Sequence, residues 1–238
     1  MSAPSRRRFY RAVAVVEADG GHSIALDGKP VQTPGRSPLA APTRALADAI
    51  AAEWDAQGDT LDPSSLRLTR LANTAIDRVP TQRAAVVAEI TGYAGTDLLC
   101  YRAAEPAALV ARQAAGWQPM LDWFAGRFDA ALEVTAGVVP VAQGTGTMNA
   151  VLAAVAALDD FTVTGLHAAT TACGSVVLGL ALAEARLDAE AAWSLSLLDE
   201  LYQVELWGED AEAADRRARL RQDITAAATF MRLARAGP

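Results

Sequence analysis

The sequence predicts an α+β fold in which a small, antiparallel, β-rich N-terminal domain precedes a larger all-helical domain. The first forty residues alternate polar and apolar side chains between turn signals, as half-buried strands do. From residue 43 onward the hydrophobic period is helical, and many alanines with few aromatics favour closely packed helices. We therefore expect residues 1–58 to form the N-terminal domain, including its first helix, and residues 59–238 to form the helical domain.

Short turn signals delimit the strands of the N-terminal domain. Residues 9–17 are rich in aromatic and valine side chains, and residues 23–26 alternate between polar and apolar. Asp27-Gly28 is a strong signal for a two-residue hairpin turn. Pro30 lacks an N–H group, so the strand that follows this turn is expected at an edge of the sheet.

Helical segments follow, and caps, glycines and prolines set their limits. They cover residues 43–57, 66–77, 80–92, 106–128, 147–158, 164–186, 188–207 and 209–234. Thr164 and Asp188 are candidate N-caps, and Pro119 predicts a kink or a break near Gln118. Between the helices, residues 98–101 are typical of a short strand or a buried turn, and residues 132–141 are extended.

Composition and charge exclude several classes of protein. The formal net charge of −7 does not suit nucleic acid, whose phosphates select basic surfaces. The cysteines Cys100 and Cys173 fit neither a disulfide framework nor a zinc site. The most apolar stretch, residues 165–183, is interrupted by His167 and by hydroxyl side chains. We therefore expect a buried helix there and no membrane insertion.

No arrangement of residues indicates a catalytic, cofactor or metal site. Gly144-Thr145-Gly146 lacks the third glycine and the lysine of a phosphate-binding loop. Cys173 and His167 are six residues apart on one predicted helix, where they point about 120° away from each other. One alternative stays open, a cysteine-dependent hydrolase that uses Cys173 or Cys100 with a base supplied from elsewhere in the fold.

The predicted helix over residues 188–207 carries an anomaly near its end. In the register of its apolar stripe, Glu205 falls on the apolar side and Trp207 on the polar side. A carboxylate against apolar surface costs free energy unless it is paired, and an exposed tryptophan is typical of an interface. Either these residues bind a partner, or Glu205 meets an internal arginine such as Arg70 and Trp207 lies beneath a loop.

Several strings of residues, spread over nearly the whole chain, together resemble one known family. They are Leu26-Asp27-Gly28-Lys29-Pro30-Val31 with Thr33-Pro34, Pro42-Thr43 with Leu46-Ala47, Ala52-Glu53-Trp54-Asp55, residues 68–77, residues 96–102, residues 170–175, and Trp207-Gly208. Residues 68–77 mix polar with regularly spaced apolar side chains and contain no reacting group, which points to a binding protein. The family is that of the F1-ATPase assembly chaperones that bind the α subunit, in mitochondria and α-proteobacteria.

This resemblance implies a chaperone that is not an enzyme, uses no cofactor and holds newly made F1 α subunits until the β subunit arrives. The family's functional glutamate would be Glu205 or Glu209. We expect the partner-binding residues to be Glu200, Glu205, Trp207 and Glu209. We expect a structural polar cluster, which fixes the two domains together, from Trp54, Arg70, Asn73 and Asp77. A generic protein-binding scaffold with other partners is the second alternative.

The resemblance also bears on location and assembly. Mitochondrial members of the family carry an N-terminal targeting extension, and this sequence shows none. We therefore expect a bacterial cytoplasmic protein, with the mitochondrial matrix as the location of its eukaryotic relatives. A monomer is the default expectation for its oligomeric state.

Overall fold

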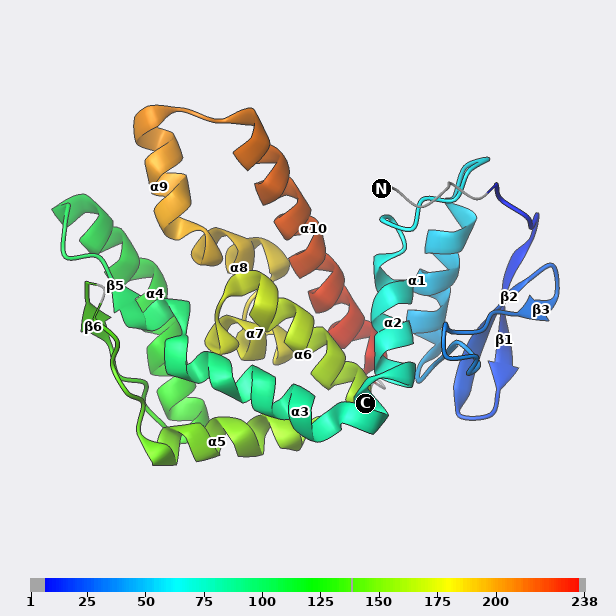
Figure 1. Cartoon of the computed structure of the whole chain (residues 1–238), viewed down its shortest axis with the longest axis horizontal. Helices are drawn as coiled ribbons and strands as arrows, with labels where there is room; N and C mark the ends of the chain where they lie inside the picture. The colour runs from blue at the N-terminus through cyan, green and yellow to red at the C-terminus, as the bar shows by residue number, and fades with distance from the viewer. Residues whose placement is uncertain (1–6, 138, 236–238) are drawn as a thin grey trace. The chain divides into compact units, whose positions relative to one another are not determined.

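The computed structural model describes residues 7–137 and 139–235 (Figure 1). These residues form a small antiparallel sheet near the N-terminus and a larger helical part, which confirms the predicted α+β class. They divide into two compact units. Unit 1 contains the described residues up to 83, residues 160–164 and the described residues from 229 onward, and unit 2 contains the described residues of 84–159 and 165–228. The predicted boundary after residue 58 lies inside unit 1, and a division at that position stays a prediction.

The sheet of unit 1 is built on the hairpin that the sequence predicts. Its strands are β1 (Val13–Ala18), β2 (Gly21–Leu26), β3 (Lys29–Pro30) and β4 (Ala40–Ala41), and β2 pairs antiparallel with each of the others. Asp27 and Gly28 adopt φ angles of 48° and 78° between β2 and β3, as a two-residue hairpin turn requires. The Asp27 carboxylate also accepts the N–H groups of Arg11 and Ala12, at 3.1 and 2.9 Å, which ties the turn to the segment before β1.

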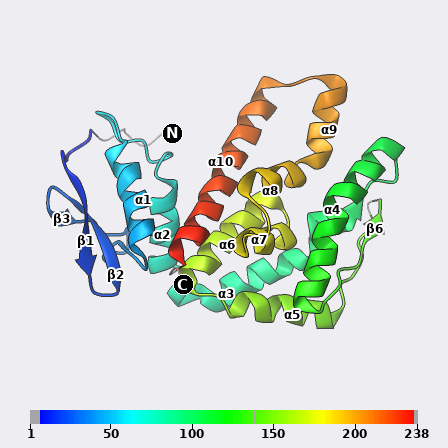
Figure 2. The ribbon, with the colours of Figure 1, turned by 180° about the vertical axis from the view of Figure 1, so that it is seen from behind.

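A carboxylate on one helix of unit 1 caps the next helix. α1 (Arg44–Asp55) packs on β1 and β2 and against α2 (Arg67–Asp77) (Figure 2). The N-terminus of α2 has no capping side chain of its own. Instead, the Glu53 carboxylate of α1 accepts the N–H groups of Leu68 and Thr69 at 2.6 and 2.9 Å. Burial raises the pKa of Glu53 by more than these hydrogen bonds lower it.

Short parts of three later helices complete unit 1. They come from α3 (Val79–Gly92), α6 (Asp160–Cys173) and α10 (Ala211–Ala234). Phe161 stacks on Phe230 with the ring centroids 5.7 Å apart, and Arg83 forms an ion pair with Asp160. These contacts join segments that are distant in sequence, so the periodicity of any one segment does not predict them.

α7 (Val176–Ala183) lies in the core of unit 2, and all eight of its residues are buried. α4 (Ala107–Phe128) packs against α5 (Thr145–Ala156), α7 and α9 (Leu198–Trp207), and α8 (Ala189–Ser196) packs against α7 and α9. The remaining elements are two 3₁₀ helices, η1 (Tyr93–Thr96) and η2 (Leu98–Cys100), and the parallel pair of β5 (Tyr101–Arg102) and β6 (Thr135–Ala136). The largest fully buried side chains of α4 are Trp117 and Phe124.

A buried carboxylate from a distant segment caps α7. Asp97 accepts the Ser175 hydroxyl and the Val177 N–H at 2.9 and 3.1 Å, and the Leu99 N–H at 3.0 Å. Burial raises the pKa of Asp97 to about 6, although these hydrogen bonds oppose the rise. Two strings that carry the family resemblance, residues 96–102 and residues 170–175, are thereby joined in the core of unit 2.

Two of the predicted helices are each divided in two. Residues 164–186 contain the end of α6 and all of α7, because Gly174 adopts a φ of 65° and Ser175 caps the new helix. Thr164 lies inside α6 and does not cap it. Residues 188–207 form α8, capped by Asp188 as predicted, and α9, and the two meet at Leu197 with φ −112° and ψ 16°.

The break predicted near Gln118 does not occur. α4 is continuous from residue 107 to residue 128 with Pro119 inside it. A proline in a helix removes one backbone hydrogen bond and crowds the preceding turn. Buried side chains on both sides of it, Trp117 and Met120 among them, hold this part of α4 in the core and offset that loss.

Candidate functional site

A groove in unit 2 contains two of the four residues predicted to bind a partner. It lies between α9 and the first turns of α10, which form a helical hairpin (Figures 1 and 2). Gly208 ends α9 with a φ of 88°, and the Asp210 carboxylate begins α10 by accepting the Ala213 N–H at 2.8 Å. The groove has a volume of about 530 Å³, and its lining includes Asp199, Glu200, Val204, Trp207 and Arg217.

Arg217 of α10 links this helix to α9 and to the turn between them. This residue is only 4% exposed, and its guanidinium donates to Glu200 Oε1 at 2.8 Å and to Glu209 Oε1 at 2.7 Å. Arg216 forms a second ion pair with Glu200. Partial burial raises the pKa of Glu200, but the hydrogen bonds from both arginines outweigh it and keep that pKa below its usual value. Glu200 and Glu209 are thus bound within unit 2, where they position the turn between α9 and α10.

An Arg217→Met variant tests this arrangement. We expect hydrogen exchange in residues 198–216 to become faster by about tenfold or more, since loss of a buried charged partner loosens the hairpin. Arg216→Met is the matched control, because Arg216 also pairs with Glu200 but its side chain is 55% exposed. Exchange mass spectrometry measures both variants. Equal protection of the hairpin in the two variants would show that Arg217 does not hold it.

Glu205 is exposed, although it follows Leu198 and Leu201 on the same face of α9. Its carboxylate forms a bidentate ion pair with Arg112 of α4, at 2.7 and 2.8 Å, and its side chain is 57% exposed. The hydrogen bond from Arg112 lowers the pKa of Glu205. Leu198, Leu201 and Glu205 all lie within α9 at spacings of three and four residues, so the break at Leu197 does not alter the helical face that they share. The arginine that meets Glu205 is Arg112 and not Arg70.

Trp207 is exposed at the end of α9. It is 77% exposed and its neighbour Leu206 is 56% exposed, so Trp207 does not lie beneath a loop. The side chains of Glu205 and Glu209, on either side in sequence, are 57% and 62% exposed. An exposed aromatic side chain flanked by carboxylates is suited to anchoring a protein partner that has basic groups at its rim.

Asp77, one of the residues predicted in a polar cluster, instead joins α2 to the loop between β3 and β4. Its carboxylate accepts the Thr33 hydroxyl and the Gly35 N–H, both at 2.7 Å. A Cβ atom added to Gly35 would lie 2.7 Å from this carboxylate, so the close approach needs glycine. Asp77 is therefore structural, but its partners are in the loop.

Of the other three residues of that predicted cluster, Trp54 lies on α1, and Arg70 and Asn73 lie on α2 with Asp77. Trp54 packs edge-on against Tyr10, whose hydroxyl donates to the Trp54 carbonyl at 2.6 Å. Arg70 is exposed on α2, and Asn73 Oδ1 is buried without a hydrogen-bond partner among the described residues. Among the described residues, no hydrogen bond joins any two of the four predicted side chains.

Sequence reasoning missed Arg217 and Arg112. Residues 211–223 are rich in charge and look like a solvated helix face. One signal was nevertheless present, since Arg217 shares a helical face with Ile224 and Ala227, which are fully buried. Arg112 had no comparable signal, because its partner Glu205 lies 93 residues further along the chain.

The two thiols are poorly suited to nucleophilic chemistry. Cys100 and Cys173 are both buried. Burial, together with the nearby charge of Asp97, raises the pKa of each thiol to about 12. His167, the base considered for Cys173, instead has its Nε2 3.2 Å from Glu89 Oε2. The arrangement therefore provides neither a thiolate near neutral pH nor a base that would create one.

We expect both thiols to react slowly with iodoacetamide in the folded protein. At pH 8 a thiol with a pKa of about 12 is ionised in roughly one molecule in ten thousand, and burial restricts access further. Mass spectrometry of the native protein should show little alkylation, and full alkylation after unfolding in guanidinium chloride. Rapid labelling of either native cysteine near pH 6 would restore the hydrolase alternative.

The described residues show neither a metal-binding group of side chains nor a helix that could span a membrane. Within 7–137 and 139–235, no group of three or more His, Cys, Asp or Glu side chains is placed to hold a metal ion. None of the helices in this part of the chain has both the length and the apolar character needed to cross a membrane.

Comparisons with known proteins give a consistent result. A family model described as ATP12 chaperone protein matches residues 7–125. Protein atp12, mitochondrial, of Schizosaccharomyces pombe is 25% identical over 226 residues, which covers 89% of this chain and 78% of that protein. The crystal structure of Atp12 from Paracoccus denitrificans is 45% identical with a TM-score of 0.90, covering 96% of this chain and 98% of that one. The Atu1473 protein of Agrobacterium tumefaciens is 41% identical with a TM-score of 0.92, covering 97% and 87%.

Proposed function

This chain belongs to the ATP12 chaperone family, and we propose that it binds the unassembled α subunit of F1-ATPase and shields its subunit interface until F1 assembles. The family predicted by the sequence resemblance is thereby confirmed, and the α subunit as partner belongs to the proposal. The protein acts as a monomer in the bacterial cytoplasm, whereas the relative from Schizosaccharomyces pombe is named as mitochondrial.

The physical basis is the apolar surface that an orphan subunit exposes. An α subunit without its β neighbours leaves uncovered the patch that β will bury, and such patches drive aggregation. A chaperone needs a complementary apolar anchor that releases the subunit later. Trp207 with Leu206 provides this anchor, and their exposure at the end of α9 is the observation that carries the proposal.

The carboxylates near Trp207 divide into two roles. Glu205 and Glu209 are more than half exposed and can meet basic groups of the α subunit, while each also keeps an arginine partner in unit 2. Glu200, whose side chain is 26% exposed and bound by Arg216 and Arg217, acts mainly by positioning the hairpin. Charges at the rim of an interface change the association rate and the salt dependence more than the affinity.

The experiment is co-purification of this protein with the isolated F1 α subunit, followed by measurement of affinity. We expect Trp207→Ala to weaken binding by about tenfold or more, as loss of a buried aromatic anchor does. Leu152→Ala is the control, because Leu152 on α5 is 43% exposed but lies on another helix of unit 2. Absence of a complex at micromolar concentrations of both proteins would refute the α subunit as partner.

The two alternatives make different predictions. A cysteine-dependent hydrolase is disfavoured by the raised pKa values of Cys100 and Cys173 and by membership in a chaperone family. A generic scaffold would capture partners unrelated to F1-ATPase. A pull-down from the native host, read by mass spectrometry, distinguishes it, since the chaperone should recover the α subunit and lose it when Trp207 is replaced.

A further inference from the structure

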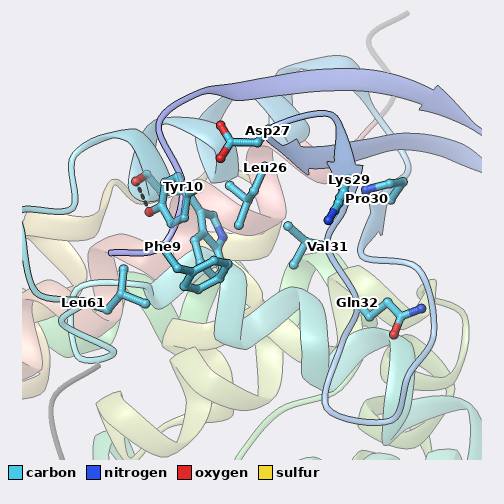
Figure 3. Close-up of a pocket in the computed structure, with 10 residues that line it drawn as sticks. Phe9, Tyr10, Leu26, Asp27, Lys29, Pro30, Val31, Gln32 and Leu61 are labelled. Atoms are coloured by element: carbon cyan, nitrogen blue, oxygen red, sulfur yellow. Dashed lines mark hydrogen bonds between the residues drawn. The ribbon is translucent and has the colours of Figure 1, made fainter. Parts of the chain in front are cut away.

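A second pocket lies in unit 1, and its lining residues are distant in sequence from those of the α9–α10 groove. Its volume is about 500 Å³. Phe9 and Tyr10 lie on one side of it, and Lys29 and Val31 lie on the other (Figure 3). Trp54 of α1 also lines it. The pocket is therefore formed by three aromatic side chains, the strand β3 with the residues after it, and a few aliphatic neighbours.

Most polar groups around this pocket have structural partners. The Asp27 carboxylate accepts two backbone N–H groups, those of Arg11 and Ala12. The Arg8 guanidinium donates to the carbonyls of Asp55 and Gln57. Each of these groups ties one segment of unit 1 to another, so the fold itself accounts for them.

Three polar groups at the pocket have no such partner among the described residues: the Lys29 ammonium, the Trp54 indole N–H and the Gln32 side-chain amide. In the part of the chain that the structure describes, no hydrogen bond or ion pair reaches the ammonium of Lys29, which is exposed at the rim. The indole N–H of Trp54 is buried, and it too lacks a hydrogen-bond acceptor among those residues. A buried donor without an acceptor costs free energy, which an acceptor on a bound ligand would recover.

These features fit a polypeptide better than a small metabolite. Small-molecule sites usually have several polar groups that converge on the ligand. Here the walls are mainly apolar and aromatic, and the single unpaired charge is at the rim. Aromatic-lined grooves of this kind bind extended peptides, which insert apolar side chains and offer backbone carbonyls to an indole N–H. The positive charge of Lys29 selects a carboxylate beside the inserted side chain.

We propose that this pocket binds an extended segment of the F1 α subunit, in which an apolar side chain that enters the pocket is adjacent to an aspartate or glutamate that pairs with Lys29. The proposal rests on the proposed function, because it takes the α subunit as the client. It assigns to unit 1 a second contact of opposite charge to the acidic groove of unit 2. Two contacts on one client raise the overall affinity above that of either alone.

Lys29 allows a direct test because it is the only lysine in the chain. A zero-length carbodiimide crosslinker joins amines to carboxylates, so any crosslink that uses an amine of this protein is at Lys29 or at the N-terminal amine, and crosslinks through its own carboxylates are told apart by mass spectrometry. We expect mass spectrometry of the crosslinked complex to find Lys29 joined to an Asp or Glu next to an apolar residue of the α subunit. Lys29→Arg keeps the charge, and it should abolish that crosslink while the affinity stays within about twofold of wild type.

Two further variants measure binding itself. Lys29→Glu reverses the charge at the rim, and Phe9→Ala removes an aromatic wall that is already 57% exposed, so neither change should unfold unit 1. We expect each to weaken α-subunit binding by about five- to tenfold. Arg70→Glu is the control for charge, because Arg70 is exposed on α2 and does not line the pocket. Thermal unfolding of each variant confirms that it is folded.

The outcomes separate this inference from the proposed function. Wild-type binding that survives Lys29→Glu and Phe9→Ala unchanged, with no crosslink at Lys29, would overturn the pocket while leaving the chaperone function intact. A complex that also forms equally with a generic unfolded protein, and crosslinks to it at Lys29, would overturn the specific acidic–apolar segment. Failure of the wild-type protein to bind the α subunit would overturn both proposals.

Discussion

A Gly179→Val variant is expected to lose about 3 kcal/mol of its free energy of unfolding, since overpacking of a well-packed core costs roughly this much. Gly179 lies in the centre of α7, where every residue is buried. A Cβ atom placed on it would be 2.4 Å from Thr170 Oγ1 and 3.0 Å from Leu166 Cδ1, both on α6. Two different side chains of α6 are too close, so rotation of one of them does not remove the conflict. α6 and α7 would have to move apart.

Gly126→Val is the matched control. Gly126 also lies inside a helix, α4, but a Cβ atom there meets nothing within 4 Å. Valine and glycine differ only modestly in helix propensity, so this change should alter the free energy of unfolding by less than about 0.5 kcal/mol. Guanidinium chloride unfolding followed by circular dichroism measures both variants. Similar stabilities for the two would mean that α6 and α7 do not approach as closely as the structure indicates.

The second large effect is a pH dependence that comes from Asp97. Its pKa is raised from 3.8 to about 6 in the folded protein. Between these values the folded state holds a proton that the unfolded state has lost, so the free energy of unfolding decreases as pH rises. A shift of two pKa units corresponds to about 3 kcal/mol. The stabilisation is complete below pH 4, falls between pH 4 and pH 6, and changes little above that.

Asp97→Asn removes this titration. The amide also places a donor opposite the Ser175 hydroxyl and the Val177 N–H, so the variant should be less stable than wild type at pH 4. We expect the difference in unfolding free energy between wild type and variant to shrink by about 2 kcal/mol from pH 4 to pH 6.5. Comparison of the two proteins cancels the titration of the other carboxylates.

Asp62→Asn is the control for that measurement. Asp62 is exposed, and its pKa is lowered by hydrogen bonds from Ser64, so its stabilising contribution is lost as pH falls and has the opposite sign. Chemical unfolding at half-unit steps of pH gives the curves for all three proteins. A wild-type minus Asp97→Asn difference that stays constant from pH 4 to pH 6.5 would show that burial does not raise the Asp97 pKa.

Local signals in the sequence were reliable where one short segment decides the conformation. The Asp27-Gly28 turn needs only its own backbone angles, and the hairpin around it formed as predicted. The helix that Asp188 caps begins there because its carboxylate accepts the Ala191 N–H, only three residues along the chain. The position of Trp207 on the polar side of the predicted helix allowed either exposure or burial beneath a loop, and the structure shows it exposed.

The same signals failed where a distant segment takes part. The break between α6 and α7 depends on Asp97, whose carboxylate binds Ser175 from 78 residues away. α2 begins within one residue of its predicted start, but the group that caps it, the Glu53 carboxylate of α1, was not predicted. In both cases a hydrogen bond joins two of the strings that carry the family resemblance, Ala52–Asp55 with residues 68–77 and residues 96–102 with residues 170–175. The polar residues Glu53 and Asp97 therefore have a structural role that neither string indicates by itself.

The amino-acid order alone therefore establishes the α+β class, the first hairpin, most helical segments and membership in the ATP12 chaperone family. Those features depend on periodicity, turn residues and short strings that act within a few residues of one another. The division of the long helices, the pairing of Glu205 with Arg112 and the burial of Arg217 were decided by tertiary structure. The reason is physical: a buried charge or a helix end takes whichever partner packing brings to it, and that partner can be anywhere along the chain.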